Sequence, residues 1–332
     1  MMTVFNRLGG MTSAALTSPF DVLRTRLQSD YYQQQLAAAR ASRGIPPPSS
    51  LPLFRASILH VRETFQILFA IPRVEGWRAL FKGLGPNLVG VVPARSINFY
   101  CYGNGKKLIS NTFNNGEEAM WVQLIAGASA GIITGTATNP IWLVKTRLQL
   151  DKAEAEFEGK GRKYRGAWDC MAKTLREEGI RGLYRGLTAS YLGVTESTTQ
   201  WVLYEQGKQY LARREEAIIA SKRSRTLWDE IVSNTGNLVA AGGAKFVAAI
   251  LTYPHEVVRT RLRQAPMQDG HIKYTGLLQC FTTIFREEGL PALYGGLVPH
   301  MLRVVPSAAI MFGTYEAVLR LLGESSSNNN TR

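Results

Sequence analysis

The longest uncharged stretch of the chain runs from Ala119 to Val144, 26 residues without an Asp, Glu, Lys or Arg. At a rise of about 1.5 Å per residue, a helix of this length crosses the roughly 30 Å hydrocarbon layer of a membrane. Five other stretches are long enough to span but are interrupted by charged or polar residues, namely 3–28, 84–108, 187–210, 231–263 and 296–322. Hydropathy alone would not assign these five to a membrane.

A repeated element relates the weaker stretches to the strong one. Eight residues that begin with proline recur with similar side chains, from Pro19 to Arg26, from Pro140 to Arg147 and from Pro254 to Arg261. A Glu-Gly pair follows each copy, at Glu75, Glu178 and Glu288. The sequence therefore predicts three units, at 1–112, 113–224 and 225–324, each with two spanning helices, and a disordered polar tail at 325–332.

Two spans per unit return the chain to the side on which it started, so all three units insert in the same orientation. We therefore expect an all-α membrane protein, in which six transmembrane helices form three units related by a pseudo-threefold axis around a central path. Short helices on one side connect the two spans of each unit. The N-terminal residues resemble neither a basic presequence nor a signal peptide, so any targeting information is expected to be internal.

Composition changes this picture little. Lys and Arg outnumber Asp and Glu by 39 to 25, a net charge of +14, which suits a phosphate-rich partner of any kind. The three cysteines are widely spaced and predict no disulfide framework, and the four histidines have no metal-ligand spacing. With no P-loop, an enzyme is poorly supported. A soluble nucleic-acid-binding repeat protein would explain the charge but not the 26 uncharged residues.

Each repeated proline falls near the end of an odd-numbered span, where it should kink the helix towards the bundle axis. An acid lies two positions after Pro19 and Pro254, and a base lies five positions after all three prolines. Three such ends in a ring place an acid of one unit beside a base of the next. Ion pairs there would close one mouth of the path, and each is weak enough to break, at about 1 kcal/mol.

The thrice-repeated proline element resembles the signature of the mitochondrial carrier family, and the resemblance covers nearly the whole chain. It implies an inner-membrane exchanger with alternating access and both termini in the intermembrane space. It also implies a matrix gate in which Asp21 faces Lys145 and Glu256 faces Arg24. Gln28 and Gln149 would brace these pairs. Trp142 stands where the third acid belongs, which leaves Arg259 without its partner.

The family's second gate, on the cytoplasmic side, is complete only at Glu205 and Lys208. Its remnants in the other units are Lys106, without an acid, and Glu316, without a base. The glycines that follow an aromatic and a variable residue, Gly83, Gly186 and Gly296, resemble the family's cardiolipin-binding turns, with exposed amides at helix N-termini. Cardiolipin is thus the expected structural lipid, and neither a cofactor nor a metal is expected.

Charged side chains within spans are costly and are therefore candidates for substrate binding. Together with polar neighbours on the same helix faces they form the predicted substrate site: Arg95, Asn98, Glu196, Gln200, Trp201, Lys245, His300 and Arg303. Three cations, an acid, amides and an aromatic ring suit a nucleotide. Simpler interpretations remain open, in which Arg95 or Arg303 pairs with Glu196, Trp201 faces lipid, or Lys245 extends its amine to the membrane surface.

Within the family, the likeness is greatest to the pyrimidine nucleotide carriers, including the fungal form. It rests on Trp142, on Lys245, on the residues around Glu196 and on a Gln-, Ala- and Pro-rich insertion at 31–53 that is expected to be a matrix loop with some helix. Trp142 is also similar to the residue found in NAD, FAD and folate carriers, which remain alternatives. The expected partners are a nucleotide and membrane lipid, not nucleic acid, and the expected state is a monomer.

Overall fold

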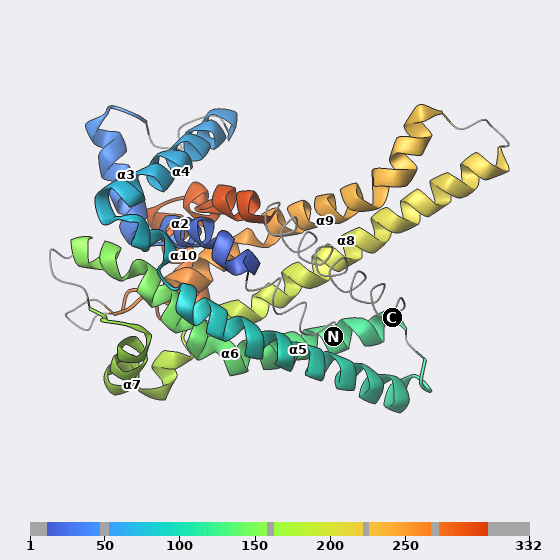
Figure 1. Cartoon of the computed structure of the whole chain (residues 1–332), viewed down its shortest axis with the longest axis horizontal. Coiled ribbons are helices and arrows are strands. Elements are labelled where there is room, and N and C mark those ends of the chain that lie inside the picture. The colour runs from blue at the N-terminus through green and yellow to red at the C-terminus, as the bar shows by residue number, and fades with distance from the viewer. Residues whose placement is uncertain are drawn as a thin grey trace, which may run out of the picture.

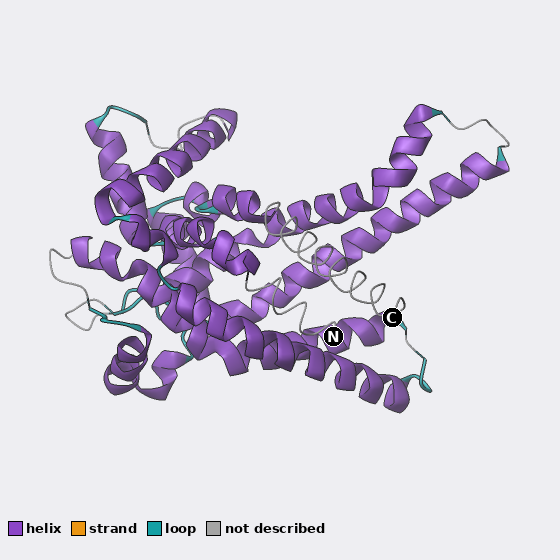
Figure 2. Cartoon of the chain, in the orientation of Figure 1, coloured by secondary structure: helices purple, strands orange, loops and turns teal. Residues whose placement is uncertain are grey.

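The computed structural model describes residues 12–46, 53–117, 119–157, 163–221, 226–266 and 272–304. Within these ranges the chain forms helices and turns without any strand, as Figure 2 shows. The three cysteines are free. The predicted all-α fold class is confirmed.

The helices follow the predicted repeat. In the first unit, residues 12–16 are helical and precede α2 (Ser18–Gln28), α3 (Asp30–Ser42), α4 (Leu53–Glu75), the short 3-10 helix η2 (Trp77–Phe81) and α5 (Leu84–Phe113). The second unit contains α6 (Met120–Phe157), α7 (Ala167–Leu183) and α8 (Leu187–Ala220). The third contains α9 (Leu227–Leu262), α10 (Leu277–Glu287), the 3-10 helix η3 (Leu290–Tyr294) and a helical segment at 297–304.

Figure 1 shows the short helices α2, α3, α4, α7 and α10 gathered at one end of the molecule. From this end the long helices leave as two pairs, α5 with α6 and α8 with α9, which diverge towards the opposite end. At the gathered end α2 packs against both α6 and α9. The described helices are therefore gathered where the repeated prolines lie, and the two long pairs separate as they leave this end.

Four of the predicted spans correspond to α5, α6, α8 and α9, and the described parts of the other two are also helical. Of the described helices, only residues Met120–Asp151 of α6 are long and apolar enough to cross a membrane by length and composition alone. Pro140 and Pro254 lie inside continuous helices, whereas α2 starts just before Pro19, after a turn at Thr17.

A buried ion pair fixes the end of each odd-numbered helix. The last arginine of the repeated element is fully buried in every unit and binds the glutamate of the following Glu-Gly pair through both ends of its guanidinium: Arg26 with Glu75, Arg147 with Glu178, and Arg261 with Glu288. Such two-pronged contacts fix orientation as well as distance. The glycine after each glutamate has a positive φ, between 68° and 84°, which favours glycine and lets the chain turn sharply there.

The insertion at 31–53 is more helical than expected. Its described part forms most of α3, because its Gln and Ala residues are good helix formers and Ser29 accepts a hydrogen bond from the backbone N–H of Tyr32 at the N-cap. Arg40 of α3 binds Glu63 of α4 through two hydrogen bonds of 2.6 Å, and both side chains are buried. The insertion thus packs against α4.

Candidate functional site

Both ion pairs expected at the end of the odd-numbered helices are formed. The Lys145 amine binds the Asp21 carboxylate, and the Arg24 guanidinium binds the Glu256 carboxylate, with each side chain only 10–13% exposed. Lys145 also donates a hydrogen bond of 3.1 Å to Asn87 of α5. These contacts link α2 to α6 and α2 to α9. We call Asp21, Arg24, Lys145 and Glu256, together with Arg259, the proline gate.

Arg259 receives no acid from α6, as expected, but it is not without a carboxylate. Its guanidinium binds Glu256, which lies three residues earlier on the same helix and also binds Arg24. The Glu256 carboxylate therefore binds two arginines, because α6 has Trp142 and not an acid at the position expected to face Arg259. The Trp142 ring packs near Gly90 of α5, and its indole N–H donates a hydrogen bond of 3.0 Å to Thr138.

Gln28 and Gln149 connect neighbouring helices but do not contact the ion pairs themselves. Gln28 donates to Tyr253, at 3.0 Å, and accepts from Thr260, at 2.6 Å. Gln149 accepts from Thr25 of α2, at 2.7 Å. The equivalent position in the third unit, which the sequence interpretation missed, is Arg263. The repeat register alone identifies it, four residues after the gate base Arg259.

A cavity of about 560 Å³ lies next to the proline gate, between the helices of all three units. Its wall has two acidic residues, Asp21 and Glu256, and six basic ones: Arg24, Arg95, Lys145, Arg259, Arg263 and Arg303. Arg303 lies 3.5 Å from Asp21. Arg95, within the described part of the chain, makes no ion pair. The surplus of positive charge suits an anion with several charges.

A second cavity, of about 300 Å³, adjoins the first, and Asn98 and Gly131 line both. Its walls include Trp201 and Tyr102 beside hydroxyl and amide groups from Gln123, Ser197 and Thr198. An aromatic ring with hydrogen-bonding groups around it can hold a flat heteroaromatic ring. Four predicted substrate residues, Arg95, Asn98, Trp201 and Arg303, thus lie on two connected cavities.

The other predicted substrate residues lie elsewhere. Glu196 and Lys245 form an ion pair of 2.5 Å with each other, and neither lines these two cavities. Lys245 is therefore the partner of Glu196 instead of Arg95 or Arg303. His300 is buried against the ring of Tyr253, with ring centroids 5.9 Å apart. Gln200 is half-buried on α8 and also lies outside both cavities.

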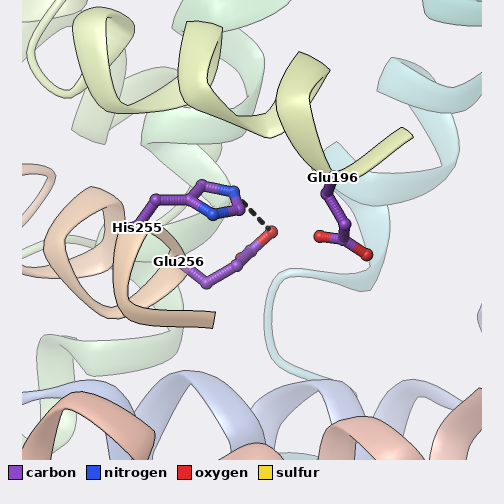
Figure 3. Close-up of side chains that lie close together, drawn as sticks. All are labelled: Glu196, His255 and Glu256. Carbon is purple, nitrogen blue, oxygen red and sulfur yellow. Dashed lines mark ion pairs between the residues drawn. The ribbon is translucent and has the colours of Figure 1, made fainter. Parts of the chain in front are cut away.

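The fold also brings together a cluster that the spacing of the histidines did not predict. Figure 3 shows His255 beside Glu256, 3.7 Å apart, with the Glu196 carboxylate turned towards them. Their possible ligand atoms lie within 4.8 Å of one another, and all three residues are buried. Both carboxylates already bind cations, since Glu196 pairs with Lys245 and Glu256 with two arginines.

At the diverging end, Lys208 lies 3.7 Å from Glu205 of its own helix, which is a contact within α8 and does not join two helices. Glu316, the third-unit remnant of the predicted cytoplasmic gate, lies outside the described residues, as does the tail at 325–332. Lys106 is on α5, which diverges from α8 in Figure 1.

The glycines predicted to bind cardiolipin have a steric role in the structure. Gly83, Gly186 and Gly296 all have φ between 76° and 79°, and Gly83 and Gly186 are the N-caps of α5 and α8. A side chain at any of them would lie within 2.8–3.2 Å of a backbone carbonyl of the next odd-numbered helix, that of Lys145, Arg259 or Arg24 respectively. Glycine thus lets each even-numbered helix begin directly against a gate residue.

Comparison with known proteins agrees with the repeat. The family model described as mitochondrial carrier protein matches residues 7–113, 116–215 and 231–326. The chain is 51% identical to mitochondrial carrier protein rim2 of Schizosaccharomyces pombe, over 95% of this chain and 88% of that protein. It is 49% identical to mitochondrial pyrimidine nucleotide transporter RIM2 of Saccharomyces cerevisiae, over 95% and 84% of the two chains. Solute carrier family 25 member 33 of Homo sapiens is 38% identical, over 95% and 92%.

Proposed function

Since this chain belongs to the mitochondrial carrier family, we propose that it transports pyrimidine nucleotides across the mitochondrial inner membrane. It is a transporter and not an enzyme. The substrate class follows from relatives that are about half identical over nearly the whole chain, one of which bears the name of a pyrimidine nucleotide transporter.

The single structural observation that carries the proposal is the pair of connected cavities next to the proline gate. The larger one presents four more basic than acidic side chains, which favours a nucleoside di- or triphosphate over a singly charged acid. The smaller one offers Trp201 and hydrogen-bonding groups for a base. In our proposal the phosphates face the gate and the base lies near Trp201 and Asn98.

Transport is proposed to be an exchange by alternating access. The proline gate is shut by ion pairs, and in our proposal the substrate site of this state opens at the opposite end, towards which the two helix pairs diverge. In a second state these ion pairs would be broken, and the helix ends far from the proline gate would come together. We further propose that the proline gate faces the matrix, that both termini lie in the intermembrane space, and that cardiolipin binds at Gly83, Gly186 and Gly296 of a monomer.

The test uses the full-length chain reconstituted into liposomes loaded with uridine triphosphate. Uptake of labelled uridine triphosphate should require internal nucleotide, and external pyrimidine nucleotides should compete better than purine nucleotides, NAD, FAD or folate. If NAD, FAD or folate competes better than the pyrimidine nucleotides, the proposed substrate class is wrong and that compound takes its place. Uptake into empty liposomes at the same rate would refute obligatory exchange. Labelling of single cysteines placed beside the three prolines tests the orientation, since all three must react from the same side.

A further inference from the structure

The three junctions of the proline gate differ in charge. Where α2 meets α6, Lys145 has Asp21, and where α2 meets α9, Arg24 has Glu256. Where α6 and α9 face each other, α6 contributes Trp142 in place of an acid, and these two helices also approach each other less closely than α2 approaches either. This third junction therefore has basic side chains from α9 without a carboxylate from α6.

One of these basic side chains is buried without an ion pair. Arg263 is 8% exposed, and its partners within the described part of the chain are neutral. It donates hydrogen bonds of 2.9 Å to the Asn139 side-chain oxygen and the Ser190 hydroxyl. Its Nε has no partner there, and the residue lines the large cavity. A buried cation without a counterion is costly, which favours an anionic ligand for it.

The surroundings of Arg263 suit an anion. Arg259 lies one helical turn away, lines the same cavity and shares its only described carboxylate partner, Glu256, with Arg24. Ser190 belongs to the first turns of α8, whose N-cap glycine provides no side-chain cap, so the positive end of that helix points to this region. The Trp142 ring is turned towards α5 and Lys145, 5.4 Å from the Lys145 amine.

We propose that Arg259 and Arg263 bind a terminal phosphate of the transported nucleotide, which supplies the negative charge that Trp142 does not provide at the third junction. The proposal rests on the proposed function. It makes the substrate a component of the closed gate. A carrier with an acid at position 142 would fill this place with its own carboxylate.

The position of the site predicts selectivity for phosphate number. Asn87, which contacts the gate, and Asn98, which borders the second cavity, are eleven residues apart on α5, about 16 Å of helix. A nucleotide whose base lies near Asn98 therefore needs an extended phosphate chain to reach Arg263. Triphosphates should gain from this contact, and monophosphates should not.

The deciding variant is Arg263→Gln, which installs the side chain present at the equivalent positions Gln28 and Gln149. In proteoliposomes its KM for uridine triphosphate should rise about tenfold or more, as expected when a charge-assisted hydrogen bond is lost, and its KM for uridine monophosphate should change less than about threefold. Arg213→Gln removes the same charge from an exposed position on α8 and should leave both constants unchanged.

If KM rises equally for uridine mono- and triphosphate, or for neither, this proposal is overturned. The proposed function still stands in that case, because the unmodified chain exchanges nucleotide. Failure of the unmodified chain to exchange any nucleotide refutes the proposed function itself. If Arg263→Gln does not fold, the variant Trp142→Asp provides a second test of the proposal. Its carboxylate should bind Arg259 and reduce the preference for triphosphate over monophosphate by about tenfold, and an unchanged preference contradicts the proposal.

Discussion

Glu178→Gln tests the buried ion pair that anchors the end of α6. Glu178 is 8% exposed and Arg147 is fully buried, so the substitution leaves an uncompensated guanidinium in the protein interior. Removing one partner of such a pair costs about 3–5 kcal/mol. Arg147 keeps its hydrogen bonds to Thr174, at 2.8 Å, and to the Arg263 carbonyl, at 3.2 Å, which favours the lower end of that range.

The expected change in Tm follows from the size of the chain. An unfolding entropy of about 2.1 cal/mol/K per residue gives about 0.7 kcal/mol/K for the whole protein, so Tm should fall by about 4–7 °C. The assay follows a maleimide dye that reacts with Cys170, which is fully buried in the folded protein and becomes accessible on unfolding. The purified protein in detergent is heated at a fixed rate.

Glu177→Gln is the matched control. Glu177 is adjacent in sequence and pairs with Lys163 at 2.9 Å, but its side chain is 47% exposed. An exposed pair contributes at most about 1 kcal/mol, so its loss should lower Tm by less than about 2 °C. Equal effects of the two substitutions would refute the argument from burial. The double variant Arg147→Met, Glu178→Leu should be more stable than Glu178→Gln, because the fully buried guanidinium of Arg147 is no longer left without its carboxylate.

The same pair predicts a pH dependence. Burial raises the pKa of Glu178, but the hydrogen bonds and charges of Arg147 and, to a smaller extent, Arg185 outweigh burial and hold the pKa below its ordinary value. The stabilisation is therefore present above the unfolded pKa, about 4.5, and is lost as the pH falls through the folded pKa. The Tm difference between the unmodified chain and Glu178→Gln should shrink at pH values below this.

Three further predictions concern transport and the gate. Arg303→Ala should abolish nucleotide exchange in proteoliposomes without loss of folded protein, and unchanged uptake would remove Arg303 from the site. Asp21→Asn should loosen the proline gate by about 1–3 kcal/mol, because Lys145 loses its carboxylate; a cysteine placed just inside the gate should then react at least about fivefold faster from the proline side. Gly296→Ala should lower stability by about 1–3 kcal/mol, measured as a lower Tm, because φ at this position is +79° and the added carbon would lie 2.8 Å from the Arg24 carbonyl oxygen. As a control, alanine in place of a helical glycine with open space around it should not lower Tm.

The repeat made much of the fold predictable. Three copies of one element fix the register of six helices even where hydropathy is weak, and they place an acid of one unit opposite a base of the next. The Asp21–Lys145 and Arg24–Glu256 pairs were expected from this register together with the resemblance to the carrier family. Contacts that depend on how far each helix is rotated about its own axis did not follow, and the pairing of Glu196 with Lys245 is one of them.

Other features escaped prediction for local reasons. Arg263 follows the last residue of α9, in a stretch that reads as a basic loop, so only comparison with Gln28 and Gln149 shows its place in the gate. His255 approaches Glu196 from another helix, and sequence spacing carries no signal for such a contact. The insertion is more helical than predicted because its alanines and glutamines favour helix, and its prolines come only after the end of α3.

The glycines at the start of the three even-numbered helices each contact the odd-numbered helix of a neighbouring unit, so that the three contacts together form a closed ring. Gly83 of the first unit rests on Lys145 of the second, Gly186 of the second on Arg259 of the third, and Gly296 of the third on Arg24 of the first. When an odd-numbered helix moves, its contact with the even-numbered helix of the neighbouring unit must therefore change too. Opening should therefore be cooperative, with all three units moving in one step, and a crosslink at any one contact should arrest the whole cycle.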